Sequence, residues 1–382
     1  MTPTDWADLT SWNRREAHLL GPWAMHSADS AGRVHPEPPH PFRSPYQRDR
    51  DRIVHSAAFR RLAHKTQVFT GNQGDYHRSR LTHTLEVTSI ARTLARALAL
   101  NEDLVETLAL GHDIGHPPLG HAGEDTLAEL LAGEGGFNHN AQALRIMELL
   151  EIRYARYPGL NLSREVLDAQ ATRKRDGKAP APLLETQAVD AADSIAYDTH
   201  DVDDAIELGL VRLDELLELP LVFEAAARAR HDLGPLGDSA LRRAVLHELV
   251  DLQVADLVAE SQATIDRLGI DSVARVRAVF DGVDGGRGVR VVSHSPPVAA
   301  GKKQLEIFLF QRVYRSARVM TVRAAAQEKL MHLFQWYVAH PEELPARFQA
   351  RAAEWGVRRS TADYLAGMTD RFLEQDHGRR LC

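Results

Sequence analysis

Residues 110–125, LGHDIGHPPLGHAGED, gather three histidines and three acidic side chains around a Pro-Pro pair. Imidazole and carboxylate groups are the side chains that most often bind divalent metal ions and transfer protons near neutral pH. Because proline and glycine interrupt helices, His112 and Asp113 are expected at a helix end that opens onto a cleft. We therefore expect this segment to carry the chemistry of the protein.

Two other segments supply groups of the same kind. His83, in RLTHTLEVTSIARTLARALAL, shares a helical face with Val87 and Leu94, which directs its imidazole toward the interior. A helix expected at 183–208 carries six aspartates among Ala, Val and Ile, although aspartate is a mediocre helix former. Two imidazoles and two carboxylates from three helices suit Mn²⁺, Fe²⁺, Co²⁺, Ni²⁺, Zn²⁺ or Mg²⁺, with positions left for water and phosphate oxygens.

The rest of the chain is helical in pattern and predicts an all-α fold. Apolar residues recur every three to four positions, and Asn101 is a typical N-cap residue. We expect helices at 50–69, 80–100, 101–113, 139–152, 183–208, 239–269, 303–338, 343–355 and 360–375. The short strand candidate is GVRVVSH (288–294). Segments rich in Pro, Gly or Ser predict an extended arm at 21–47 and loops at 171–182 and 281–301.

Composition narrows the class of protein. The 382 residues are 44% hydrophobic and carry a net charge of −7, which argues against a dedicated nucleic-acid coat. The one cysteine, Cys382, excludes disulfides within the chain and cysteine-type zinc sites. With no long apolar run and no signal-type N-terminus, we expect a soluble cytoplasmic protein without a membrane partner. We divide it into an N-terminal arm (1–50), a helical core with the histidines (51–210) and a C-terminal helical region packed on that core (211–382).

The motifs, taken in order along the chain, resemble a known family. His83…His112-Asp113…Asp193 looks like the H…HD…D signature of the HD-domain metal-dependent phosphohydrolases. Longer segments resemble the bacterial deoxyguanosinetriphosphate triphosphohydrolase-like proteins, namely RSPYQRDRDRIVHSAAFRRLAHKTQVF, GDYHRSRLTHTLEV, GHDIGHPPLGHAGE, GFNHNAQALRI, ADSIAYDTHDVDDA and LEIFLFQRVYRSARV. The similarity runs from about residue 10 to residue 375.

The resemblance implies a hydrolase that splits a deoxynucleoside triphosphate (dGTP, or dNTPs generally) into deoxynucleoside and inorganic triphosphate. It implies that His83, His112, Asp113 and Asp193 hold a divalent metal ion, whose identity stays open. Such an ion polarises the α-phosphate and orients a water molecule or hydroxide.

The resemblance also implies a catalytic pair beyond the Pro-Pro break. His121 would activate water or act as acid and base, and Glu124, three residues later on the same helical face, would orient it. His116 and His139 are further hydrogen-bond donors to the polyphosphate. The residues alone do not decide which of the three histidines transfers the proton.

Four further positions are implied to contact the substrate. Gln67 would contact the sugar 3′-OH, and Arg80 would reach the α-phosphate with its forked guanidinium. Tyr197 would pack under the sugar, where a 2′-OH would be disfavoured, and Asp201 would accept a hydrogen bond from the 3′-OH.

Two alternatives remain open at the level of sequence. The chain could be another HD phosphohydrolase, either a 5′-nucleotidase or a phosphodiesterase. It could also be a nucleotide-sensing or single-stranded nucleic-acid-binding scaffold that uses the arginines of 43–61. The resemblance further implies a homo-oligomer, and it leaves open the base preference and a second dNTP as activator.

Overall fold

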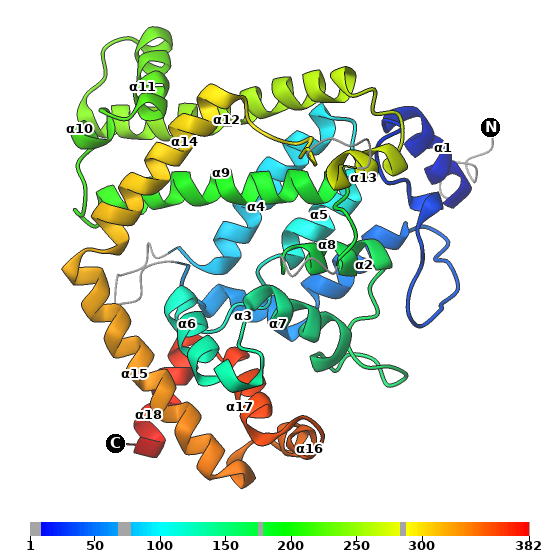
Figure 1. Cartoon of the computed structure of the whole chain (residues 1–382), viewed down its shortest axis with the longest axis vertical. Helices are drawn as coiled ribbons and strands as arrows, with labels where there is room; N and C mark the ends of the chain where they lie inside the picture. Colours follow the sequence, from blue (N-terminus) through cyan, green and yellow to red (C-terminus); the bar gives the residue numbers. More distant parts are fainter. Residues whose placement is uncertain (1–8, 68–77, 175–178, 283–287, 382) are drawn as a thin grey trace.

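The computed structural model of this chain is built from α-helices (Figure 1). It describes residues 9–67, 78–174, 179–282 and 288–381. Strand pairing within these ranges is limited to isolated β-bridges, such as the one between Arg33 and Ser163. The all-α fold predicted from the sequence is therefore confirmed. No helix within the described ranges is long and apolar enough to cross a membrane.

The described residues form eighteen α-helices. The first nine are α1 (Leu9–Leu19), α2 (Pro45–Val54), α3 (Ala57–Arg61), α4 (Arg80–Ala97), α5 (Glu102–Gly111), α6 (Gly120–Leu130), α7 (His139–Arg145), α8 (Arg164–Thr172) and α9 (Leu184–Glu207). The others are α10 (Leu213–Leu216), α11 (Pro220–Leu233), α12 (Asp238–Arg267), α13 (Val273–Asp281), α14 (Pro296–Leu309), α15 (Ala317–Ala339), α16 (Ala346–Trp355), α17 (Val357–Ala366) and α18 (Asp370–Leu381). Single π-helical turns follow α7 (Ile146–Leu150) and α14 (Phe310–Tyr314).

Helices α4, α5 and α9 form the frame that positions the histidines. Helix α4 packs against both α5 and α9, and Figure 1 shows the long α9 crossing the molecule in front of α4. The side chain of Ser79 caps α4 by accepting from the amide of Thr82, and Asn101 caps α5 in the same way through the amide of Leu104. These caps fix where the helices that carry His83 and His112 begin.

Buried apolar side chains form three clusters. The largest joins α2, α4, α5, α8 and the first half of α9 to the end of α12 and to α13. A second lies under α10, α11, the start of α12 and α14, and a third lies between α6 and α15–α18. Because α12 and α13 share the first cluster with the N-terminal helices, the boundaries 1–50, 51–210 and 211–382 stay a prediction.

Several predicted helices have different limits. The single helix expected at 303–338 is two helices, because a π-helical turn ends α14 and the hydroxyl of Ser316 caps α15. The helix expected at 360–375 is divided between α17 and α18, and the helix expected at 50–69 is divided among α2, α3 and a 3₁₀ turn. The arm expected at 21–47 ends early because α2 begins within it.

The strand predicted at 288–294 is wrong. This segment is irregular, since the amides of Val291 and Val292 donate to the side-chain oxygen of Gln187 on α9 and not to a neighbouring strand. The loop expected at 281–301 also ends early, because α14 begins within it. The central parts of the two predicted loops, 175–178 and 283–287, lie outside the described residues.

Gly115 allows α7 to approach the histidine-rich segment closely. A Cβ atom at this position would lie 2.0 Å from the carbonyl oxygen of His139 and 2.4 Å from the amide nitrogen of Ala143. Only glycine fits at this position. Its lack of a side chain allows the first turn of α7, with His139, to lie next to His116.

We predict that Gly115→Ala lowers the free energy of unfolding by about 1–3 kcal/mol, because the added methyl group must push α7 away. Gly133→Ala is the matched control, since nothing lies within 4 Å of its added Cβ. Urea unfolding followed by circular dichroism measures both variants. Equal midpoints for the two variants would contradict the close approach.

Candidate metal centre and active site

Four predicted metal ligands lie together where α4, α5 and α9 meet. His83 comes from the first turn of α4, and His112 and Asp113 follow the end of α5. These three residues each place a nitrogen or oxygen atom within 4.8 Å of the others. Oδ1 of Asp193, on α9, lies 3.1 Å from Nε2 of His83 and 3.5 Å from Nε2 of His112. The four side chains therefore face one common space.

One imidazole nitrogen in this group is buried and unpaired. Nδ1 of His112 donates to the carbonyl oxygen of Ala109 at 2.6 Å, which leaves Nε2 without a proton. Nε2 has no hydrogen-bond partner among the described residues, although buried polar atoms are nearly always paired. Burial lowers the pKa of His112, which favours the neutral imidazole that binds metal. The residues present therefore fit a divalent cation.

His83 is oriented by a chain of polar contacts that the sequence did not reveal. Its Nδ1 lies 3.2 Å from Nδ1 of His200, and Nε2 of His200 lies 2.5 Å from Oε2 of Glu86. Burial would raise the pKa of Glu86, but the hydrogen bond from His200 lowers it, so Glu86 is ionised. An ionised Glu86 accepts the Nε2 proton of His200. Nδ1 of His200 can then accept from His83, which turns the lone pair of His83 Nε2 toward the other ligands.

Arg80 is buried against a proposed metal ligand. Its guanidinium donates to Oδ2 of Asp113 at 2.8 Å and to the carbonyl oxygen of Gln67 at 3.3 Å. Burial would raise the pKa of Asp113, but the nearby His116, Arg80 and His112 hold it well below its usual value. Asp113 is therefore an anion at neutral pH, as a metal ligand must be.

The predicted acid–base residues form a second group next to the first. Nδ1 of His116 lies 2.8 Å from Oδ1 of Asp113, and its ring stacks on that of His139 with centroids 3.8 Å apart. Nδ1 of His139 lies 2.8 Å from Oε1 of Glu124. His121 is 49% exposed, and its Nδ1 is 3.8 Å from Oε2 of Glu124. Glu124 is thus in closer contact with His139 than with His121.

The predicted sugar-contact residues lie on the face of α9 that follows Asp193. Tyr197 and Asp201 both contact the hydroxyl of Tyr314, which lies 2.7 Å from that of Tyr197. Burial, followed by the charges of Asp198 and Asp204 on the same helix, raises the pKa of Asp201 well above its usual value. Tyr314 comes from the π-helical turn after α14 and was not singled out from the sequence.

Gln67 has an unpaired side-chain oxygen, and the nearby Lys65 joins the Pro-Pro segment to the C-terminal region. Gln67 is buried, and its side-chain oxygen has no partner within the described residues. Nζ of Lys65 donates to the carbonyl oxygens of His116 and Ala366. Burial lowers the pKa of Lys65 to about 7. Lys65 could not be identified from local sequence patterns, because its partners lie far from it along the chain.

Comparison with known proteins identifies the family to which this chain belongs. Residues 80–198 match the HD domain, and residues 292–379 match the phosphohydrolase-associated domain. The deoxyguanosinetriphosphate triphosphohydrolase-like protein of Paracoccus denitrificans is 42% identical over 95% of this chain and 100% of its own length. Proteins of the same name from Geobacter metallireducens and Leptospira interrogans are 41% and 37% identical, over 96% and 95% of this chain and 96% of each relative. The chain belongs to this family.

Membership in the deoxyguanosinetriphosphate triphosphohydrolase-like family places the protein among the HD phosphohydrolases, whose domains bind divalent metal ions. The HD match ends at residue 198, so it includes all four proposed ligands and Tyr197 on α9. The phosphohydrolase-associated match includes Tyr314, which returns to the same face from the C-terminal region.

We predict that His200→Phe weakens divalent-metal binding about 10- to 100-fold, because His83 loses the partner that fixes its ring and tautomer. His294→Phe is the control, since His294 also contacts an acid, Asp256 at 3.1 Å, but on other elements. Competition with a chelating fluorophore measures both affinities. Unchanged metal affinity in His200→Phe would show that this contact does not orient His83.

Proposed function

We propose that the protein hydrolyses deoxynucleoside triphosphates to deoxynucleoside and inorganic triphosphate in the cytoplasm, with a divalent metal ion held by His83, His112, Asp113 and Asp193. The observation that carries the proposal is the unpaired, buried Nε2 of His112 facing two carboxylates. The family relationship supports a nucleotide as the substrate. A metal ion bound there would supply positive charge for the α-phosphate and a water of lowered pKa.

The second group supports a proton-transfer role beside that phosphate. Burial would raise the pKa of Glu124, but the imidazoles of His121 and His139 hold it well below its usual value. An ionised Glu124 accepts from Nδ1 of His139 and so orients the imidazole that would donate a proton to the departing 5′ oxygen. Water adds to the α-phosphorus, the bond to the 5′ oxygen breaks, and triphosphate leaves with its charge spread over its oxygens.

The remaining predicted contacts support a deoxyribose-bearing substrate. Tyr197 and Asp201 lie along α9 beyond Asp193, where they and Tyr314 would form a sugar-binding face. Gln67 offers an unpaired side-chain oxygen, and Arg80, with an unpaired Nε, would contact the α-phosphate.

The alternative readings receive less support from the contacts. A nucleic-acid-binding scaffold would use the arginines of 43–61, but Arg48 and Arg52 both form ion pairs with Glu37. Another HD phosphohydrolase, acting on monophosphates or cyclic nucleotides, would release phosphate or a nucleotide in place of triphosphate. A second dNTP as activator remains a prediction, which sigmoidal kinetics would support.

We also propose a homo-oligomer. Helices α14 and α15 and the turn between them expose four large apolar side chains to solvent, between 38% and 51% of each: Ile307, Phe310, Met320 and Val322. A second copy of this chain could cover them. Sedimentation velocity at micromolar concentrations, with and without dNTP, is expected to show a species larger than the 42.5 kDa chain. A single monomeric species under all these conditions would contradict the proposal.

Variants at the two groups are predicted to separate metal binding from proton transfer. Asp113→Ala should lose both metal and activity, because an anionic ligand is removed. His139→Ala should keep its metal and lose turnover by about 10²–10⁴-fold. His121→Ala should lose less, because His121 is further from Glu124. Glu124→Ala combined with His139→Ala should cost little more than either alone, since residues that act as a unit are not additive.

The measurements are metal content, and the products formed from each dNTP with a panel of divalent ions, separated as triphosphate, pyrophosphate and phosphate. Triphosphate as the first product supports the proposal, and phosphate or pyrophosphate would replace it with another phosphohydrolase activity. A larger loss in His121→Ala than in His139→Ala would reverse the roles of the two histidines.

A further inference from the structure

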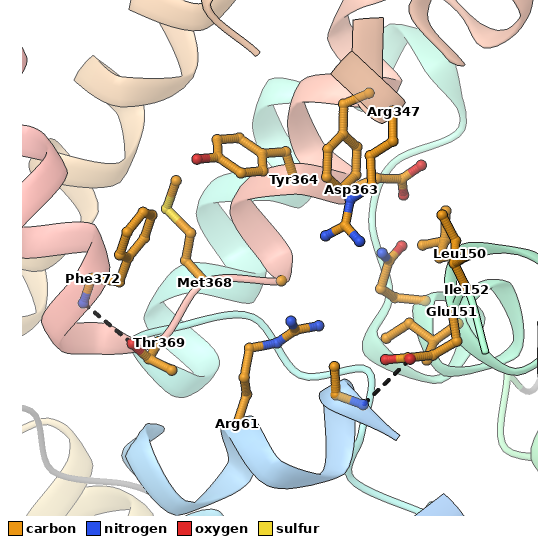
Figure 2. A pocket seen from close by; sticks show the side chains of 15 residues that line it. Arg61, Leu150, Glu151, Ile152, Arg347, Asp363, Tyr364, Met368, Thr369 and Phe372 are labelled. Atoms are coloured by element: carbon orange, nitrogen blue, oxygen red, sulfur yellow. Dashed lines mark hydrogen bonds between the residues drawn. The ribbon is translucent and has the colours of Figure 1, made fainter. Parts of the chain in front are cut away.

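A cavity lies between α7 and the C-terminal helices, and its lining includes none of the residues of the proposed active site. Its volume is about 380 Å³, within the range of about 300–1,000 Å³ that is typical of small-molecule sites. Helix α3, helix α7 with its π-helical turn, and helices α16–α18 enclose it (Figure 2). The lining therefore combines segments from both ends of the chain.

Two arginines point into this cavity, and one of them, Arg347, also lies over the ring of Phe348. Figure 2 shows the guanidinium groups of Arg61 and Arg347 directed into the space between α3 and α17. Neither group forms a hydrogen bond or ion pair with any residue that the structure describes, and Nε of Arg61 is buried. Burial lowers the pKa of the Arg61 guanidinium. A poorly hydrated cation that forms no ion pair attracts an anion.

The acids at the edge of the cavity are already engaged. Both carboxylate oxygens of Glu151 accept from the backbone amides at the start of α3. The carboxylate of Asp363 forms a two-pronged pair with the guanidinium of Arg145, at 3.1 and 2.5 Å. Neither acid forms an ion pair with Arg61 or Arg347, although the charge of Glu151 acts on Arg61 from a distance. The N–H groups of the two guanidinium groups are therefore available to a ligand.

One more polar group lacks a partner, and most of the remaining lining is apolar. Gln142 is 2% exposed, and its side-chain oxygen makes no hydrogen bond within the described part of the chain. The cavity is otherwise walled mainly by large apolar and aromatic side chains, including Phe348, Tyr364, Met368 and Phe372. Guanidinium groups suit a phosphate, whereas aromatic and thioether groups suit a flat apolar ring.

We propose that this cavity binds an aromatic phosphate monoester, with the phosphate between Arg61 and Arg347 and the ring against Tyr364 and Phe372. A nucleoside monophosphate and a simple aryl phosphate share this chemistry. The site goes beyond the proposed function, because none of the residues assigned to metal binding, proton transfer or sugar contact lines it.

The walls of the cavity continue into the proposed active site. Arg61 is four residues before Lys65, which holds the carbonyl oxygen of His116. Gln142 is one helical turn after His139 on α7. Asp370, just after the lining residue Thr369, accepts from the amides of Thr66 and Leu119. A ligand that draws these walls together would restrain the segments on both sides of the Pro-Pro break.

Isothermal titration calorimetry with phenyl phosphate, deoxyguanosine monophosphate and inorganic phosphate tests the proposal. The two aromatic esters should bind, and inorganic phosphate should bind at least about 10-fold more weakly, because it lacks the ring. Arg61→Met should weaken phenyl phosphate binding about 10- to 100-fold. Arg60→Met is the matched control, because Arg60 is the neighbouring residue of α3, is exposed and donates to the carbonyl oxygen of His55.

Arg347→Met removes the second proposed phosphate contact. Because Arg347 is exposed, this substitution should not affect folding. It should weaken binding as Arg61→Met does. Amide hydrogen exchange should slow at 57–67 and 366–373 when phenyl phosphate binds, and should not change at 220–233 on α11. Equal binding by the Arg60 and Arg61 variants, full binding by Arg347→Met, or equal affinity for inorganic phosphate would each overturn the proposal.

Discussion

A buried imidazole nitrogen that lacks a hydrogen bond costs roughly 1–3 kcal/mol, and a folded chain rarely keeps one without a reason. In this protein Nε2 of His112 is such an atom, and Oδ1 of Asp113 and of Asp193 lie 3.6 and 3.5 Å from it. A divalent cation in that space would satisfy the nitrogen and both carboxylates together. Much of the surrounding structure either positions these groups or keeps the carboxylates ionised, as ligands of a cation must be.

Helix α9 shows how the fold accommodates many carboxylates close to that centre. Its aspartates are each engaged by a different element, which explains why a helix former as poor as aspartate recurs there. Arg173 and Arg290 bind Asp190, Lys302 binds Asp198, Tyr314 contacts Asp201, Arg242 binds Asp203 and Arg78 binds Asp204. Asp193 alone faces His83 and His112. The partners from residues 242, 290, 302 and 314 also fasten the C-terminal region to this helix.

Periodicity and spacing predicted much of this arrangement. The apolar repeat located α4, α9 and α12, and the inward phase of His83 placed it in the interior. Local spacing predicted less where contacts between residues far apart in the sequence determine which side chains meet. Glu124 was expected to pair with His121 three residues away, but it lies nearer His139, because Gly115 admits the start of α7. His200 and Tyr314 were not found, since the first meets His83 across 117 residues and the second depends on a π-helical turn.

The most direct test of the account is the position of a metal ion in the crystalline protein. Crystals soaked with Mn²⁺ and measured at the manganese absorption edge should show one anomalous peak. It should lie roughly 2.0–2.3 Å from Nε2 of His83, Nε2 of His112 and an oxygen of each of Asp113 and Asp193. A peak among His116, Glu124 and His139, which could also hold a metal ion, or no peak at all, would contradict it.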